Sequence, residues 1–398
     1  MFIIKNLIFT LSYPLVLFLD LLSIFIKFKF SEINVSRLGH ATIYVEGFIS
    51  YKKFLIKNEF KNTKIIFYFS KPIVNHQVTK MIKRVLPIYR PSIFFYFLSR
   101  VLIFWKRNKY ILKFNYSIKN PEVLNQFSKI YKKPNLYFLD KEIFKAKKLL
   151  INFGIKEKDK WICIHNRDSA FLEKKFPKKN WSYHSFRDFS ANDLTNAANY
   201  FAEKGFYVFR MGSVQKERLN STKSKVIDYA FSNLRCDLLD IYLLAKCEFY
   251  FGGESGPSDI AFSFKKPCYG INFPPTYLYM SRPHLPWIFI FKRIMDIRTN
   301  QLLTLRETFF NKLDGINDSD FLKKKKYKLI DNSSESILEF AIEVLKDYSG
   351  NLSEDSDDIS NQKKFWDIYY QHNSDNRGFE IHPKISPNFL RKNIDLIS

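Results

Sequence analysis

A chain of 398 residues is long enough for two domains with separate cores, because most domains have ~100–200 residues. Its 46% hydrophobic content excludes a disordered chain. The formal net charge of +25 favours anionic partners such as nucleotides or phospholipid headgroups. The positive charge has a second explanation, the codon bias of an AT-rich genome, because Lys, Phe, Ile, Asn and Tyr are all abundant together. No nucleic-acid-binding module is recognisable, so we expect no nucleic-acid partner.

The chain begins with an apolar segment. Residues 7–26 contain one charge, Asp20, and one proline, Pro14. This length suffices for a membrane-spanning helix, whereas a central aspartate opposes insertion by ~2.5–3.5 kcal/mol. No small-residue cleavage site follows, so the segment does not fit a removable signal peptide. We expect a membrane-associated helix that either spans the bilayer or lies on it.

A second segment, 89–110, combines aromatic and aliphatic residues with Arg90, Arg100, Lys106 and Arg107. Such a segment fits the headgroup region of an anionic membrane. A core helix with solvated ends explains the same pattern equally well. From the two segments we expect the protein at the cytoplasmic face of the inner membrane, either peripheral or held by a single anchor.

Strands alternate with helices along the rest of the chain. A strand, a glycine-containing turn and a helix start are predicted within 32–49, and 63–70 is an apolar run typical of a strand buried on both faces. After a candidate linker at 132–140, five strands are predicted, at 160–165, 206–213, 225–230, 248–253 and 267–272. Further helices are predicted at 192–205, 236–247 and 257–266. This alternation indicates an α/β fold with parallel sheets.

We divide the chain into four parts: a hydrophobic helix (1–30), an N-terminal domain (31–140), a C-terminal domain (141–330) and a final part (331–398). Within the final part, 334–348 has the apolar spacing of an amphipathic helix. The acidic, turn-rich sequence that follows, GNLSEDSDDISNQ, is expected to be a mobile tail.

Polar residues gather at the carboxyl ends of the predicted C-terminal strands, where open parallel sheets bind ligands. The candidates are His165, Arg167 and Asp168 after the first strand, Arg210, Gly212 and Ser213 after the second, Asp228 after the third, and Glu254, Ser255 and Gly256 after the fourth. The last three belong to GGESGPSDIA, a glycine-rich turn that leads into a helix N-terminus and therefore suits a phosphate. Arg167 and Arg210 add bidentate donors, although a surface ion pair explains either arginine alone.

Residues 160–272 resemble the C-terminal, nucleotide-sugar-binding half of GT-B glycosyltransferases, especially the ADP-heptose:lipopolysaccharide heptosyltransferases. In that group a strand ends in a phosphate-binding Asp-(Ser/Thr)-Gly turn that is followed by a His. The matching positions here are Glu254, Ser255 and Gly256, with Asp259 in place of the His. An ionised Asp259 cannot donate to a phosphate. We therefore expect either a larger contribution from the arginines or a different nucleotide.

The stretches CIHNRDSAFL, WSYHSFRDF and FRMGS, together with IDYAFSNLRCDLLDIYLLAKCEFYFGGESGPSDIAF, are similar to a family of bacterial glycosyltransferases of surface-polysaccharide synthesis. The resemblance covers about residues 31–310. It implies the GT-B fold, two Rossmann-like, doubly wound domains with a facing cleft. It also implies metal-independent transfer of a sugar, without a cofactor, from a nucleotide-diphosphate donor to a glycan or lipid-linked acceptor.

The same resemblance implies a catalytic base in the N-terminal domain. Heptosyltransferases carry a Gly-Asp pair after their first strand, and the equivalent stretch SRLGHATIYVEGF has His40 at the position of that Asp. An unperturbed histidine pKa near ~6.5 suits base catalysis at neutral pH. Glu46 is the rival base, and a structural, hydrogen-bonded role is an equal interpretation of His40. Arg37 is a candidate for contact with acceptor or donor phosphate.

Metal sites and disulfides are not expected. His165 and His184 have no partners at metal-ligand spacing, and no DxD-type carboxylate pair follows a strand. The four cysteines include no CxxC pair, which favours buried free thiols in a reducing cytoplasm; they are Cys163, Cys236, Cys247 and Cys268.

Two other functions stay open at the level of the sequence. Nucleotide-sugar 2-epimerases share the fold and a similar phosphate turn, but they need neither an acceptor nor a membrane. The second is a non-catalytic binding protein of a polysaccharide-assembly complex, which would have the same fold but would not need a catalytic base.

Overall fold

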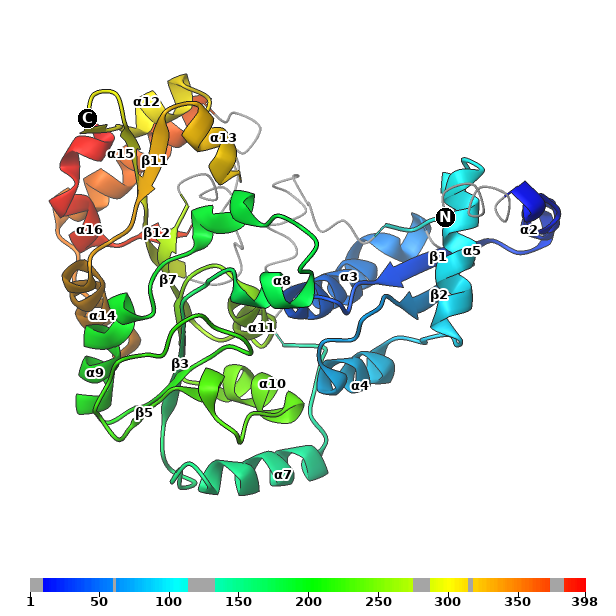
Figure 1. The fold of residues 1–398 in the computed structure, drawn as a ribbon, viewed down its shortest axis with the longest axis horizontal. Helices are drawn as coiled ribbons and strands as arrows, with labels where there is room; N and C mark the ends of the chain where they lie inside the picture. The colour runs from blue at the N-terminus through cyan, green and yellow to red at the C-terminus, as the bar shows by residue number, and fades with distance from the viewer. Residues whose placement is uncertain (1–9, 60–61, 114–132, 275–286, 314–317, 373–382) are drawn as a thin grey trace. The chain divides into compact units, whose positions relative to one another are not determined.

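The structure of the protein, a computed structural model, describes residues 10–59, 62–113, 133–274, 287–313, 318–372 and 383–398 (Figure 1). Residues 7–9 of the apolar N-terminal segment lie outside this part of the chain. The chain divides into two compact units. One contains Met1–Ile118 and Lys133–Phe138, and the other contains Lys119–Lys132 and Leu139–Ser398.

The first unit is built on two parallel strands, β1 (Phe28–Ile33) and β2 (Lys64–Phe69). The predicted strand at 63–70 is β2. Isolated parallel bridges from Ile111 to Phe30 and from Ile88 to Phe67 widen the sheet. Since parallel neighbours need a crossover, α3 (Leu38–Glu59) connects β1 to β2. The unit also contains α2 (Tyr13–Phe25), α4 (His76–Val85), α5 (Ser92–Phe104) and the 3₁₀ turn η1 (Asn108–Tyr110).

Helix α2 lies within the apolar N-terminal segment. It has 13 residues and carries Pro14 in its first turn, where a missing N–H costs no helical hydrogen bond. The chain becomes extended at Ile26 and enters β1. Within the described ranges, no helix combines the length and the apolar character needed to cross a bilayer.

The second unit contains a seven-stranded, fully parallel sheet with the order β12-β8-β7-β6-β3-β4-β5. Its strands are β3 (Trp161–His165), β4 (Tyr207–Arg210), β5 (Val226–Ile227), β6 (Tyr250–Gly252), β7 (Cys268–Phe273), β8 (Trp287–Phe291) and β12 (Lys384–Ile385). The predicted α/β fold with a parallel sheet is thus confirmed. The strand predicted at 225–230 is shorter than expected, because a 3₁₀ turn, η4 (Tyr229–Phe231), follows Ile227.

Helices cover both faces of this sheet, which explains why its strands are mainly apolar. Phe201 and Phe340 pack on one face with Phe251, and all three are buried. The helices of that face are α9 (Thr195–Glu203), α14 (Ser334–Tyr348), α15 (Ser356–His372) and α16 (Pro387–Lys392). On the other face Trp161 stacks on Tyr242. The helices there are α7 (Asp140–Ile151), α10 (Asp237–Lys246) and α11 (Gly256–Ser263).

Smaller elements complete the second unit. The short helices are α8 (Ala170–Lys175), η2 (Ser182–Arg187), η3 (Asn192–Leu194), α12 (Leu305–Phe310), α13 (Ser319–Lys324) and η7 (Ile394–Ile397). A small antiparallel sheet has the order β10-β9-β11, formed by β9 (Arg293–Asp296), β10 (Gln301–Leu302) and β11 (Tyr327–Ile330).

The acidic C-terminal segment differs from the predicted mobile tail. Residues from Ser356 onward form α15, whose Phe365, Ile368 and Tyr369 are buried in the main core. Asp357 and Asp358 lie in its first turn, where negative charge complements the helix dipole. The acidic residues therefore begin a core helix instead of marking disorder.

Candidate active site

The sheet of the second unit has a topological switch point between β3 and β6. From β3 the chain proceeds to β4 and β5 on one side, and then returns to place β6 and β7 on the other. Numbered from β3, the order of the first six strands is the 3-2-1-4-5-6 order of dinucleotide-binding folds. Open α/β sheets bind ligands at the carboxyl ends of the strands that flank such a point. The residues after β3 and β6 therefore define the candidate site.

Two glycines let these strand ends approach closely. A Cβ on Gly252 would lie 2.3 Å from the carbonyl oxygen of His165, and one on Gly253 would lie 2.7 Å from the Phe189 ring. The Gly253 N–H instead donates to the His165 carbonyl at 3.0 Å. A side chain at Gly252 would thus separate β6 from β3. The two glycines serve the packing of the site, and a ligand is not needed to explain them.

Beyond the glycines, the chain turns into the N-terminus of α11. Ser255 is fully extended (φ −169°, ψ −179°), and its N–H donates to Ser258 Oγ at 3.1 Å. Asp259 lies in the first turn of the helix. The helix dipole brings partial positive charge to this turn, which favours an anion, whereas the Asp259 carboxylate opposes it.

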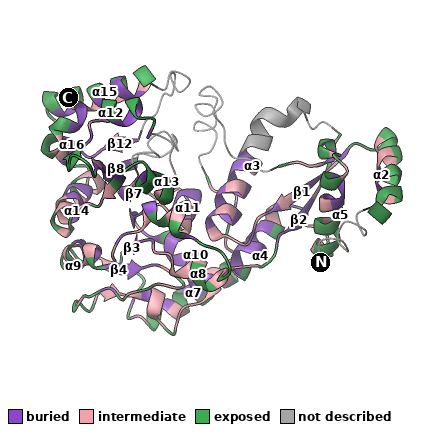
Figure 2. Cartoon of the chain, turned by 45° about the horizontal axis from the view of Figure 1, so that its top comes forward, coloured by how far each residue is buried: buried purple, intermediate pink, exposed green. Residues whose placement is uncertain are grey.

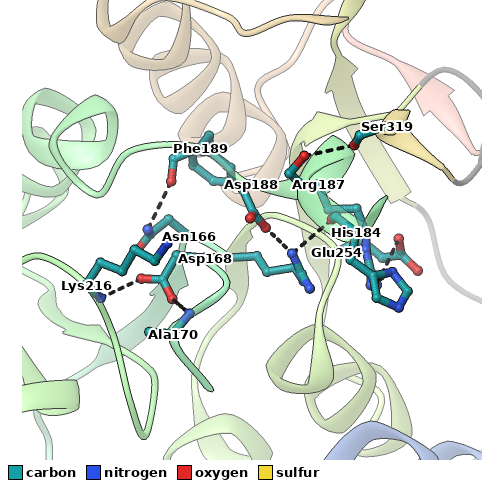
Figure 3. Close-up of polar contacts among 12 residues, drawn as sticks. Asn166, Asp168, Ala170, His184, Arg187, Asp188, Phe189, Lys216, Glu254 and Ser319 are labelled. Carbon is teal, nitrogen blue, oxygen red and sulfur yellow. Dashed lines mark hydrogen bonds and ion pairs between the residues drawn. The ribbon is translucent and has the colours of Figure 1, made fainter. Parts of the chain in front are cut away.

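Arg167 holds the loop after β3 against the loop that contains η2, in which Figure 3 labels His184 and Asp188. Its guanidinium pairs with the Asp188 carboxylate and donates to the His184 carbonyl at 3.1 Å. Burial raises the pKa of the Asp188 carboxyl, an effect that the neighbouring Arg167 opposes. Burial also lowers the pKa of Arg167, and Arg187 adds to this because it is a nearby like charge. Two arginines thus lie close together beside the switch point.

Arg187 and Lys292 belong to the site but were not among the residues that the sequence suggested. Arg187 lies 3.9 Å from the Glu254 carboxylate and donates to His184 Nδ1 at 3.2 Å. Lys292 directly follows β8, is almost fully buried, and donates to the Asp188 carbonyl at 2.7 Å. Had WIFIF been recognised as a strand, the same strand-end rule would have identified Lys292.

Arg210 is a structural residue, which corrects its predicted direct contact with a diphosphate. Its side chain is fully buried, and its guanidinium donates to Asn166 Oδ1 at 2.9 and 3.1 Å, to Asp228 at 3.1 Å and to Gln215 at 3.0 Å. Asp228 also accepts from the Leu219 N–H at 2.9 Å. Together Arg210 and Asp228 connect the loops after β3, β4 and β5. A side chain without exposed surface cannot reach a ligand at this site.

The other predicted residues after β3 and β4 shape the loops. His165 is buried, and its Nδ1–H donates to the Met211 carbonyl at 2.8 Å. This burial lowers the pKa of His165 to about 3, so the ring is neutral at physiological pH. Asp168 accepts from the N–H groups of Ala170 and Lys216 at 3.0 and 2.8 Å, which fixes the start of α8.

Gly212 and Ser213 follow β4. A Cβ on Gly212 would lie 2.7 Å from Gln215 Nε2, so the bare backbone makes room for the side chain that Arg210 contacts. Ser213 is exposed. Of the predicted residues after β4, Ser213 therefore has the side chain with direct access to solvent.

The first unit contains the predicted base candidates at the carboxyl end of β1. Arg37 precedes α3, and its carbonyl accepts from the Ala41 N–H at 3.1 Å. His40 lies in the first turn of α3, with its Nδ1 3.5 Å from Asn34 Nδ2 and its ring 4.7 Å from that of Tyr44. His40 is partly exposed and can reach solvent.

Glu46 has a different environment one turn and a half further along α3. Its buried carboxylate accepts from the N–H groups of Asn135 and Leu136 at 2.9 and 2.6 Å, and from Asn135 Nδ2 at 2.8 Å. Glu46 thus anchors the chain segment at 135–136 to α3. Three hydrogen bonds thus occupy the Glu46 carboxylate, which serves to hold this segment.

No cluster of three or more His, Cys, Asp or Glu side chains suited to a metal ion occurs within the described parts of the chain. The four cysteines are free thiols; Cys163, Cys247 and Cys268 are buried and Cys236 is half-buried.

Comparison with known proteins gives structural similarities only. No family model and no curated protein matches the sequence. A family 9 glycosyl transferase from Veillonella parvula is 11% identical over 81% of this chain and 98% of its own, with a TM-score of 0.46. ADP-heptose lps heptosyltransferase II from E. coli is 11% identical over 66% and 90% of the two chains, with a TM-score of 0.38. MnaA from S. aureus, in complex with UDP, is 10% identical over 86% and 97%, with a TM-score of 0.31. At these values none of the similarities assigns the chain to a family.

Proposed function

We propose that the protein is a glycosyltransferase of the GT-B type that moves a sugar from a nucleoside-diphosphate donor to a glycan or lipid-linked acceptor. The observation that carries the proposal is the switch point of the second unit. There, strand ends brought together by Gly252 meet the N-terminus of α11, beside Arg167 and Arg187. Helix N-termini and guanidinium groups are the two features that proteins use most directly to hold phosphates.

In this proposal the leaving diphosphate is stabilised by the second unit. Arg167, Arg187 and the first turn of α11 supply positive charge where negative charge develops as the bond between the sugar C1 and the phosphate oxygen breaks. Arg187 replaces Arg210 in this role, since Arg210 is fully buried. No metal ion is required by this chemistry, because fixed cations and dipoles neutralise the departing group.

His40 is the proposed base. It takes the proton of the acceptor hydroxyl while that oxygen attacks C1 of the sugar, and the nucleoside diphosphate departs. His40 is preferred to Glu46 because the Glu46 carboxylate already accepts three hydrogen bonds from the segment at 135–136. We further propose that the acceptor is reached at the cytoplasmic face of the inner membrane.

Donor binding is tested by measuring the thermal stability of the full chain with UDP, GDP, ADP and CMP and their sugar conjugates. A ligand that binds only the folded state raises the melting temperature by mass action. We expect one nucleotide class to do so. Arg187→Ala should weaken its binding at least about tenfold, because a charge-assisted hydrogen bond contributes roughly 1.5–3 kcal/mol.

The control is Arg298→Ala, since Arg298 is half-exposed and pairs with Asp296 in the small antiparallel sheet. Its nucleotide affinity should equal that of the wild type. The proposal is wrong if no nucleotide stabilises the protein, or if the two variants lose affinity equally.

The role of His40 is tested by transfer of labelled sugar from the identified donor to a bacterial membrane extract. His40→Ala should lower the turnover about 10²–10⁴-fold with unchanged donor affinity, as loss of a general base does. His76→Ala is the control, because His76 is an exposed histidine at the start of α4 in the same unit. Equal activities of the two variants would contradict the role. Release of an epimerised nucleotide sugar without acceptor would instead indicate a 2-epimerase.

A further inference from the structure

Helix α2 is apolar on both faces, yet the protein covers only one of them. Val16 and Leu19 are buried against the rest of the first unit. The residues on the opposite side recur every three or four positions along the helix. Their exposed fractions are 48–78%, and they are Leu17, Phe18, Leu21, Ile24 and Phe25. The pattern of burial is that of an amphipathic helix, whereas the residue types on the two faces are alike. Exposure of the apolar side chains on the second face to water is unfavourable.

Helix α5 repeats this arrangement. Leu98, Val101 and Leu102 are buried, and the side chains on the other face are exposed by 37–58%: Ile93, Phe94, Tyr96, Phe97, Ile103 and Phe104. Figure 2 shows exposed residues along much of both helices. The exposed residues of α2 and α5 together are called the apolar surface below. Monomeric proteins rarely leave so many neighbouring large apolar side chains in water.

The two helices lie side by side and pack against each other (Figure 1). Val16 packs with Val101 and Trp105, and the Tyr13 and Trp105 rings are 4.5 Å apart. Leu19 joins the cluster that contains Leu98 and Leu102, which lie on the buried face of α5. The apolar surface therefore belongs to one rigid part of the first unit.

Asp20, the acidic residue within α2, is held on the protein side of the helix. Its carboxylate accepts from Tyr110 Oη at 2.6 Å and from Arg107 Nε at 2.8 Å. The hydrogen bond from Tyr110 is the main reason why the pKa of Asp20 is lowered. The aspartate that opposes insertion of the whole segment into a bilayer thus leaves the exposed face of α2 uncharged.

Positive charge borders the apolar surface. Lys27 follows α2, Arg90 precedes α5 and Lys106 follows it, and all three are exposed. Residues 90–110 contain five Lys and Arg residues, of which Arg100 pairs with Glu32, and Arg107 and Lys109 pair with Asp20. In a two-fold dimer through this surface the same cations would face each other, which is unfavourable. An apolar layer beneath anionic headgroups complements both the side chains and the charges.

We propose that the apolar surface docks the protein on an anionic lipid bilayer as a monotopic contact, with α2 and α5 lying in the headgroup region. The 13 residues of α2 extend only about 20 Å, less than the ~30 Å hydrocarbon core. This inference rests on the proposed membrane location but not on the proposed sugar transfer. It chooses between the two interpretations of the N-terminal segment, since the helix lies on the bilayer and does not span it.

The test is co-sedimentation of the full chain with vesicles of phosphatidylglycerol and phosphatidylethanolamine, or of phosphatidylcholine alone. The wild type should bind the anionic vesicles. Phe18→Glu should bind them at least about tenfold more weakly, because it removes an inserted phenyl ring and adds a charge of the wrong sign. Phe310→Glu is the matched control, since Phe310 is 83% exposed on α12 of the second unit. Its binding should be unchanged.

A second pair of variants separates the electrostatic contribution. Lys27→Glu and Lys106→Glu should each weaken binding to anionic vesicles by roughly fivefold or more, with little change on phosphatidylcholine. Carbonate should release the wild type from the vesicles. The nucleotide-induced rise in melting temperature should be the same in Phe18→Glu as in the wild type, so failure here and failure of the proposed function are distinguishable.

Four outcomes would overturn the inference. They are no binding of the wild type to anionic vesicles, equal losses in Phe18→Glu and Phe310→Glu, retention of the wild type after carbonate treatment, and a lipid-free dimer that Phe18→Glu dissociates. The third would indicate a spanning segment, and the fourth would assign the surface to a second copy of the chain.

Discussion

At the scale of single residues, the arginines of the second unit have two distinct roles. Arg210 is surrounded by acceptors from three loops and has no exposed surface. Arg187 is partly exposed at the switch point and faces the carboxylate of Glu254. Arg210 ends β4, whereas Arg187 ends η2 and is far from any strand end in the sequence. Only the tertiary structure therefore separates the arginine that holds the loops from the one that can meet a ligand.

Loss of Arg210 should therefore affect stability before it affects binding. We expect Arg210→Ala to lower the free energy of unfolding by about 3 kcal/mol, because the partly buried Asp228 loses its partner. Arg218→Ala should change it by about 1 kcal/mol or less, since exposed Arg218 only covers the Phe231 ring. Urea unfolding of both variants makes the comparison, and similar midpoints would contradict a structural role of Arg210.

Because His165 is buried, we expect the free energy of unfolding to depend on pH. Burial lowers its pKa to about 3 in the folded state, against ~6.5 in the unfolded chain. The folded state thus binds the proton less well, and its stability falls as the pH drops below ~6.5. Between pH 7 and pH 5 this group should remove about 2 kcal/mol from the free energy of unfolding.

The control for that pH effect is His165→Gln, which keeps a donor for the Met211 carbonyl but does not titrate. Urea unfolding at the two pH values should give a smaller loss for the variant than for the wild type. Parallel losses in the two proteins would assign the acid sensitivity to other groups.

At the scale of elements, the sequence pattern was most informative where strands are buried on both faces. The runs that became β2, β3, β6 and β7 are mainly apolar, and glycine or polar residues lie at or near their ends. The pattern was least informative in the C-terminal part. There, the acidic residues at the start of α15 led to the prediction of a mobile tail. The helical spacing of Phe365, Ile368 and Tyr369, which pack in the core, was the signal that the prediction missed.

The C-terminal helix supplies an element-scale prediction. Phe365→Ala should lower the free energy of unfolding by about 3–5 kcal/mol, because Phe365 is fully buried and its removal leaves a cavity. Ile359 lies on the same helix and is 62% exposed, so Ile359→Ala should lower the free energy of unfolding by less than about 1 kcal/mol. Chemical denaturation measures both. A Phe365→Ala variant as stable as Ile359→Ala would mean that α15 does not contribute to the core.

At the scale of the whole molecule, the chain consists of two compact units with separate cores. The candidate phosphate site belongs to the second unit, and the proposed base and the apolar surface belong to the first. A donor nucleotide should therefore stabilise one unit directly.

Calorimetry of the full chain can test this division. We expect two unfolding transitions, and the nucleotide identified in the stability screen should raise the temperature of only one of them. Phe365→Ala should lower the temperature of that same transition, since Phe365 lies in the core of the second unit. A single transition that shifts as a whole would show that the two units unfold together.

The sequence by itself determined the alternation of strands and helices, the parallel sheet and the strand ends at which a phosphate site could form. These features depend on local periodicity and on turn chemistry, which neighbouring residues reveal. Only the tertiary structure decided which strand ends lie at the switch point, that Arg210 and Glu46 are occupied by structural partners, and that Arg187 and Lys292 join the site. It also showed that Asp20 faces the protein while its apolar neighbours face outward. Such facts depend on contacts between residues far apart in the chain, which local patterns do not contain.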